Sequence, residues 1–164
     1  SFTCIALLLC PGCGNSPPPN DATLVTEFQA HRPDYERLLG MFREDSGVGR
    51  IAYDFTRPAN FFSGAPLRSA SILPAERLNQ YHRLFDRLTL PGGIEGYDAK
   101  HVVYFWRYAE GMGAGLGGSS NGFAYSDSLP PNTPSAVGCQ APQSECWQFR
   151  PIADGWFVLE ERHN

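Results

Sequence analysis

The first long series of regularly spaced apolar residues predicts a helix close to the start of the chain. The apolar side chains recur at helical intervals, at Leu24, Phe28, Tyr35, Leu38, Leu39 and Phe42. Asp21 stands where an N-cap is expected, and Asp45-Ser46-Gly47 marks the end of the pattern. Pro33 lies inside it, so we expect the helix to be kinked or split in two at that point.

A second helical pattern follows a short strand and a long loop. The segment RIAYDFTRP alternates apolar and polar residues and predicts a strand, whereas residues 59–73 are typical of a loop. The segment AERLNQYHRLFDRL then carries an apolar face made of Leu78, Tyr81, Leu84, Phe85 and Leu88. Pro74 suits the start of this helix, and Pro91-Gly92-Gly93 ends it.

Strand patterns dominate the C-terminal half. HVVYFWRYA is β-branched and aromatic on both faces and predicts a central strand, and NGFAYS predicts another. CWQFRPI and WFVLEER flank Asp154-Gly155, a dipeptide that favours a hairpin. Because helices precede strands, we expect an α+β fold, with two or three N-terminal helices packed on a C-terminal antiparallel β-sheet of three to five strands. Residues 22–164 are expected to form one such domain.

Composition narrows the class of partner. The 164 residues carry a formal net charge of -4, and 42% of them are hydrophobic, which is typical of a globular protein. An acidic chain without runs of Lys or Arg lacks the basic face that nucleic acid requires. We therefore expect no nucleic-acid partner.

The extreme N-terminus indicates export. Phe2 to Leu9 is a short apolar run of the length found in secretory signals, and it is too short to span a bilayer. The following CPGCGNS resembles the lipobox of bacterial lipoproteins, with Gly12 before Cys13. An ordinary cleaved signal, or a buried strand of a truncated protein, remains an alternative interpretation.

The lipobox resemblance implies a division of the N-terminus and a location. Residues 1–12 would be a signal peptide, Cys13 the lipidated residue, and residues 13–21 a proline-rich spacer. Gly14, which is not Asp, follows the cysteine and implies anchoring in the outer membrane, facing the periplasm. The alternative is a soluble periplasmic protein.

Two further cysteines, Cys139 and Cys146, form an even pair in a segment rich in Pro, Ser and Gln. In an exported protein such a pair predicts a disulfide bond. Their spacing differs from that of zinc sites and no histidine is near in sequence, so we expect no metal.

A second resemblance covers most of residues 22–162. The segments HRPDYERLLGMF, YDFTRP, AERLNQYHRLFDRL, SSNGFAYS and FRPIADGWFVLEER resemble uncharacterised small exported proteins of Gram-negative bacteria. That resemblance implies export and a compact single domain, and it brings no activity and no site residues.

Several short motifs match catalytic or cofactor patterns only in part. Residues 113–118 contain G-x-G-x-x-G and residues 118–122 match G-x-S-x-G, but a strand follows them where both motifs need a helix. His82 and Asp86 are one helical turn apart, which is usual for a surface pair. Glu160, Glu161 and Asp98 are candidate carboxylates whose separation the sequence does not give. No cofactor is expected.

Aromatic residues of the predicted sheet are the remaining candidates for a binding face. By strand alternation, the residues proposed for this face are Trp106, Tyr108, Tyr125 and Trp156. We expect a non-catalytic binding or scaffolding module, with an envelope protein, an envelope polymer or a toxin as partner. The alternative is a periplasmic hydrolase that uses Ser120 with His101 or His82, or a histidine–carboxylate pair.

Overall fold

The computed structural model describes residues 20–59, 72–97, 100–110, 119–129, 135–137 and 146–162. Two helices and eight strands occur within these ranges. The helices are α1 (Asp21–Glu44) and α2 (Ala75–Leu88). The strands are β1 (Val48–Ile51), β2 (Thr56–Pro58), β3 (Gly93–Tyr97), β4 (Val102–Glu110), β5 (Ser119–Ser126), β6 (Ser135–Val137), β7 (Cys146–Ala153) and β8 (Trp156–Arg162).

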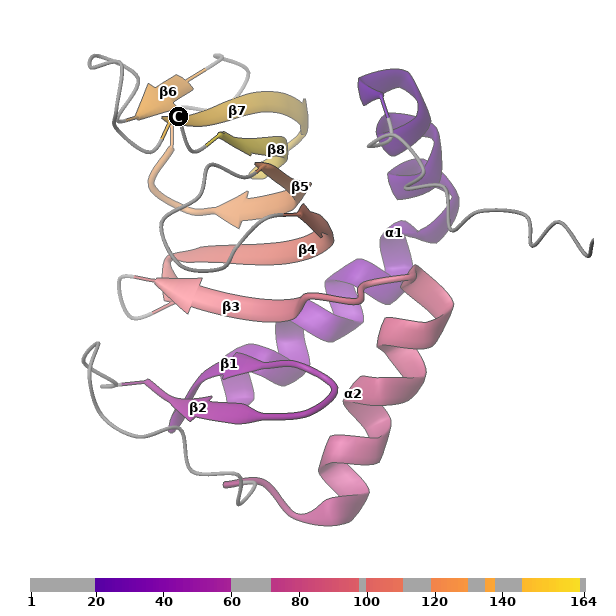
Figure 1. Ribbon diagram of the computed structural model, residues 1–164, viewed down its shortest axis with the longest axis vertical. Coiled ribbons are helices and arrows are strands. Elements are labelled where there is room, and N and C mark those ends of the chain that lie inside the picture. Colours follow the sequence, from indigo (N-terminus) through magenta and orange to yellow (C-terminus); the bar gives the residue numbers. More distant parts are fainter. Residues whose placement is uncertain are drawn as a thin grey trace, which may run out of the picture.

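The strands form a single antiparallel sheet in the order β2-β1-β3-β4-β5-β8-β7-β6 (Figure 1). The α+β class is therefore confirmed. The predicted sheet of three to five C-terminal strands is wrong, because eight strands pair among the described residues. The extra strands include β1 and β2, which precede α2 in the chain. β1 pairs with β3, which follows α2, and β2 pairs with β1 at the edge of the sheet. Sequence patterns within one segment do not reveal such long-range pairing.

Helix α1 is continuous over 24 residues. Its N-cap is Asn20, one residue before the expected Asp21, and the Asn20 side chain accepts a hydrogen bond of 2.9 Å from the Thr23 amide. Pro33 lies inside the helix without dividing it, and the helix axis changes direction midway (Figure 1). Pro33 removes one backbone donor, and its ring crowds the preceding turn, which accounts for a bend.

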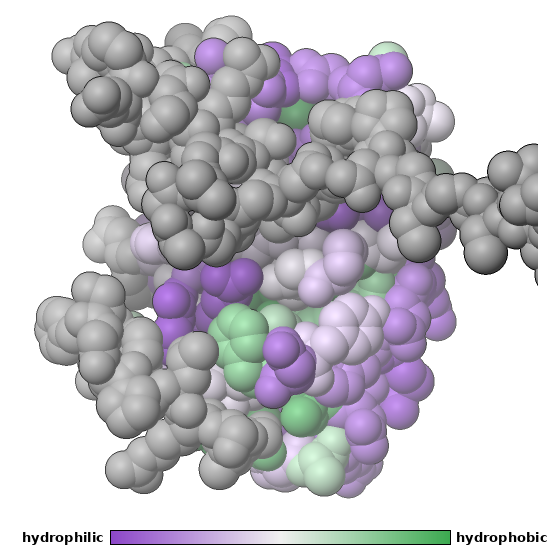
Figure 2. All heavy atoms as spheres, in the orientation of Figure 1, coloured by the Kyte–Doolittle hydropathy of each residue, from purple (hydrophilic) through white to green (hydrophobic). Residues whose placement is uncertain are grey.

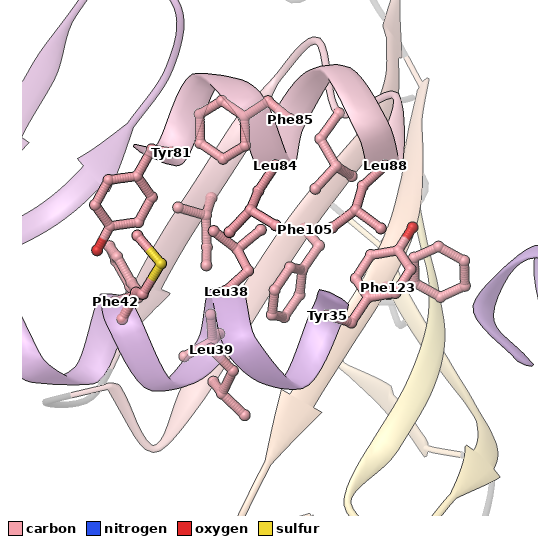
Figure 3. Close-up of a cluster of buried hydrophobic side chains, with 14 of the residues drawn as sticks. Tyr35, Leu38, Leu39, Phe42, Tyr81, Leu84, Phe85, Leu88, Phe105 and Phe123 are labelled. Atoms are coloured by element: carbon pink, nitrogen blue, oxygen red, sulfur yellow. The ribbon is translucent and has the colours of Figure 1, made fainter. Parts of the chain in front are cut away.

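The main core lies between the two helices and one face of the sheet. Figure 3 shows α1 and α2 side by side, with their apolar side chains pointing toward one another and toward the strands. Phe105 of β4 and Phe123 of β5 are fully buried against Tyr35 of α1, at ring centroid distances of 5.7 and 4.9 Å. The apolar helix faces predicted from the sequence form the helix side of this core.

A second core lies on the opposite face of the sheet. It contains Tyr104, Trp106, Phe149, Phe157 and other residues of β4, β5, β7 and β8. The Tyr104 ring of β4 stacks 5.0 Å from the Trp147 ring of β7. These strands are three positions apart, which in a flat sheet is about 14 Å. The sheet therefore curls so that β7 packs back toward β3 and β4 and shields this face.

The C-terminal end of α1 is held by two cations from distant parts of the chain. Lys100 donates from its Nζ to the carbonyl oxygens of Phe42 and of Asp45, the latter at 2.6 Å. Arg77 of α2 donates to the Met41 carbonyl at 3.0 Å and to the Asp45 carboxylate at 2.8 Å. Cations at this end satisfy the last carbonyl groups of the helix and oppose its dipole.

Neither helix described in the structure has the length and apolar character needed to cross a membrane. Cys146, at the start of β7, is disulfide-bonded. Its predicted partner Cys139 lies outside the described residues, as do the expected signal peptide, Cys13 and most of the spacer, so the pairing and the anchor remain predictions.

Candidate binding site at the curled face of the sheet

The predicted aromatic face does not form as one surface. Trp106 is buried in the core of the curled face, whereas Trp156 is buried in the core beneath the helices. Tyr125 is half-buried on the helix side, with the Arg43 guanidinium 4.7 Å from its ring. The strand alternation that placed Tyr108 beside Trp106 is broken by a register shift between them, and the Tyr108 side chain lies outside the described residues.

A row of charged residues lies across the strands at the β2 edge of the sheet. Arg57 of β2 is paired in register with Arg50 of β1, and Arg50 is paired with Glu95 of β3. Both guanidinium groups contact the Glu95 carboxylate, that of Arg50 at 3.2 Å. The Glu95 side chain is only 3% exposed, whereas the side chains of Arg50 and Arg57 are 20% and 27% exposed.

The electrostatics of this row follow from its composition. Burial, and then the like charge of Arg50, lower the pKa of Arg57, while Tyr97 opposes this shift. The indole Nε1 of Trp106 donates a hydrogen bond of 3.2 Å to Glu95. The carboxylate thus has three donors around it, as a buried charge requires.

Aromatic rings lie next to these charged residues on the same face of the sheet. Tyr104 is paired in register with Glu95, and its ring lies 4.9 Å from Tyr97 and 5.0 Å from Trp147. Tyr97 is 43% exposed, and Trp147 is half-buried. We call these six residues the Arg–Glu–aromatic site: Arg50, Arg57, Glu95, Tyr97, Tyr104 and Trp147.

Ser120 and His101, one pair of the hydrolase alternative, are not brought together. Ser120 is buried near the start of β5, whereas His101 precedes Val102, which pairs with Ser126 at the other end of that strand. Six residues of strand place these positions about 20 Å apart. His101 lies instead beside Asp127, at 3.8 Å between its Nδ1 and the carboxylate.

The other chemical candidates have structural partners or lie outside the described residues. The Tyr53 hydroxyl donates to Asp86 at 2.6 Å and its ring stacks 5.2 Å from His82, so the histidine–carboxylate pair belongs to a surface cluster. Glu160 is 3.3 Å from Arg150. Asp98, the Glu161 side chain and residues 113–118 are not described, but β5 begins at Ser119, where a dinucleotide motif would need a helix.

The rest of the described residues offer no competing site. No three His, Cys, Asp or Glu side chains are grouped there as metal ligands. A hollow of about 280 Å³ lies at the end of α1 and is lined mainly by apolar residues, including Val48, Ile72 and Leu73. Its charged lining residue, Asp45, is engaged by Arg77 and by the Tyr81 hydroxyl at 2.6 Å.

Comparison of the chain with protein-family models, with curated proteins and with solved structures finds no match.

Sequence reasoning missed the Arg–Glu–aromatic site. The sequence feature that could have indicated this site is Glu95, a single carboxylate in the short segment GIEGY. A charged residue that is fully buried needs an ionic partner, so Glu95 in a recognised strand would have indicated a nearby arginine. Because glycine is rare in strands, the two glycines of that segment weakened the strand pattern, and the strand was not predicted.

Proposed function

We propose that this chain is a lipoprotein of the Gram-negative cell envelope, whose folded part is a non-catalytic binding or scaffolding module. The observation that carries the binding function is the Arg–Glu–aromatic site. There an exposed tyrosine, supported by two further rings, lies on the same face of β3 as a buried carboxylate, which the guanidinium groups of two partly exposed arginine side chains contact. Aromatic and arginine side chains are enriched in binding sites.

The hydrolase alternative has less support. A serine nucleophile needs a base within hydrogen-bond reach, and the strand separation of Ser120 from His101 is far larger. The envelope location and the lipid anchor rest on the N-terminal segment, where CPGCGNS resembles a lipobox.

Replacement of Cys13 by alanine will release the protein from the membrane fraction into the soluble periplasm. Without the thiol no acyl chain can be attached, and the remaining chain has no lipid to bury. Fractionation and immunoblotting of cells that express the full chain measure the change. Cys10→Ala is the matched control and should leave the protein in the membrane fraction. Unchanged membrane recovery of Cys13→Ala would contradict the anchor.

Replacement of Tyr97 by alanine will weaken binding of the soluble Cys13→Ala protein to sedimented envelope material by about tenfold or more, because an exposed aromatic anchor is lost. Tyr53→Ala is the matched control, since Tyr53 is 41% exposed at a different place on the surface. Equal binding by both variants, or no sedimentation of the parent protein, would contradict the proposal. Turnover of an ester or glycoside that Ser120→Ala abolishes would support the hydrolase.

A further inference from the structure

We propose that the Arg–Glu–aromatic site takes an acidic sugar unit of a polysaccharide, with its carboxylate on Arg50 and Arg57 and a face of its ring on Tyr97. This inference rests on the binding function proposed above and specifies the chemistry of the ligand. The juxtaposition of two guanidinium groups with one exposed aromatic ring is what distinguishes this site from the rest of the described surface.

The two arginines are suited to a second carboxylate. They lie opposite each other on neighbouring strands, and each keeps part of its side chain in solvent while it contacts Glu95. A guanidinium has five N–H donors in a planar fork, so it can hold its contacts within the fold and a ligand carboxylate together. Because the guanidiniums repel each other, a further anion between or beside them is favourable.

Glu95 positions these arginines before any ligand arrives. Its carboxylate is buried, is bonded to Trp106, and comes from β3, which pairs with β1 on one side and β4 on the other. The arginines therefore lose little rotamer freedom on binding, and such preorganisation raises affinity. Glu95 is a positioning residue in this scheme, and the arginines make the contacts.

The aromatic rings form the other half of the site. The Tyr97 ring is supported by Tyr104 at 4.9 Å and by Trp147 at 6.5 Å, which leaves its outer part in solvent. The face of an aromatic ring carries a partial negative charge and attracts the C–H groups that a sugar ring presents. Tyr97 follows Glu95 by two residues on β3, so both side chains lie on the same face of the strand about 7 Å apart. Because Arg57 contacts Glu95, one sugar unit can reach both Arg57 and Tyr97.

The described surface favours a sugar over a protein partner. A stable protein interface covers about 800 Å² on each partner, with large side chains buried at its centre. Among the described residues, the exposed large apolar side chains are Tyr53, Ile72 and Tyr97, and only Tyr97 belongs to the site. On the face that Figure 2 shows, the visible hydrophobic residues lie among hydrophilic ones. Such a surface suits a small ligand with both polar and apolar groups, such as one sugar unit.

Isothermal titration of the soluble Cys13→Ala protein with oligogalacturonate tests the inference. We expect saturable binding that weakens as salt rises, because it depends on partly exposed charges. Arg57→Gln should lower the affinity about tenfold or more, since it removes a charge-assisted hydrogen bond. Tyr97→Ala should also weaken binding, whereas Arg32→Gln, which alters an exposed ion pair on α1, should not. Thermal unfolding checks that each variant is folded, and Arg57→Lys serves if Arg57→Gln is not.

Two further titrations separate the possible failures. Tighter binding of neutral cellohexaose than of oligogalacturonate would overturn the acidic-sugar inference and leave the binding function standing. Binding of polyglutamate with equal affinity and the same dependence on Arg57 would assign the site to an acidic peptide instead. Absence of binding to every probe would also overturn the inference, while the envelope sedimentation experiment decides the binding function on its own.

Discussion

Replacement of Gly122 by alanine will lower the free energy of unfolding by about 3 kcal/mol or more. A Cβ atom at residue 122 would lie 1.9 Å from the Phe105 carbonyl oxygen and 3.0 Å from the Arg107 amide nitrogen. Both are backbone atoms of β4, beside the register shift that follows Trp106. Since β5 is held between β4 and β8, the new methyl group can be accommodated only if the strands separate. Urea unfolding, followed by fluorescence, measures the loss.

Gly40→Ala is the matched control for this variant. Gly40 lies on the exposed side of α1, and nothing is within 4 Å of the position that its Cβ would take. Alanine should therefore stabilise the protein by about 0.5–1 kcal/mol through its helix propensity. A Gly122→Ala protein with a stability within 1 kcal/mol of the parent would show that β4 and β5 are not packed as closely as the structure indicates.

Both helices could be predicted from the sequence because their information is local. Every residue of the two predicted apolar helix faces except Leu78 is buried in the structure, and Leu78 packs against the same core. The spacing of apolar residues along a helix reflects which side faces the core, regardless of what covers it. The Asn20 cap was missed by one residue because Asn and Asp are comparable N-caps.

Much of the sheet could not be predicted, because its strands are short and their partners are distant in sequence. β1 contains Gly49, and β3 contains Gly93 and Gly96, which weakens the strand pattern of both. Gly93 adopts a left-handed φ of 74°, and a Cβ there would lie 2.0 Å from the Ile51 carbonyl oxygen. The glycine that obscured the strand is thus required for the close pairing of β1 with β3.

The predicted aromatic face differs from the candidate site for a related reason. Strand alternation assigns residues to two faces, but it does not show which face remains open. Here the helices cover one face, and the curl of the sheet brings Trp147 over the other, so both Trp106 and Trp156 are buried. The exposed ring, Tyr97, lies at the end of β3, a strand that the sequence did not reveal. Its arginine neighbours come from β1 and β2, which reach the site only through long-range pairing.

The stability of the protein will rise with pH between about 8 and 9.5, and Lys100 will be the cause. Burial lowers the pKa of Lys100 from 10.5 to about 8, and the charge of Asp45 only partly opposes this. As the pH rises through this window, the folded protein goes from losing about half of the Lys100 proton to losing nearly all of it, while the unfolded chain keeps it, so the unfolded state binds more protons. The free energy of unfolding must then increase, by about 1.5 kcal/mol over the window.

The window ends near pH 9.5 because the tyrosines act in the opposite direction. Burial raises the pKa of Tyr35 and of Tyr81 above the ordinary value of 10.0, so unfolded tyrosines lose protons that the folded ones retain. Their contribution lowers stability as the pH rises through 10.

Lys100→Met isolates the lysine contribution, because it keeps an unbranched side chain beside Phe42 and removes the titrating group. Urea unfolding at half-unit steps of pH should give a rising free energy of unfolding for the parent, and one that does not rise, and falls slightly toward pH 9.5, for the variant. The chain has no other lysine, so no second lysine side chain can supply the same slope. Curves that run parallel for the two proteins would show that the Lys100 ammonium is not desolvated at the end of α1. A slope present only in the parent would show that this helix end is held by a cation at neutral pH and by a neutral amine above pH 9.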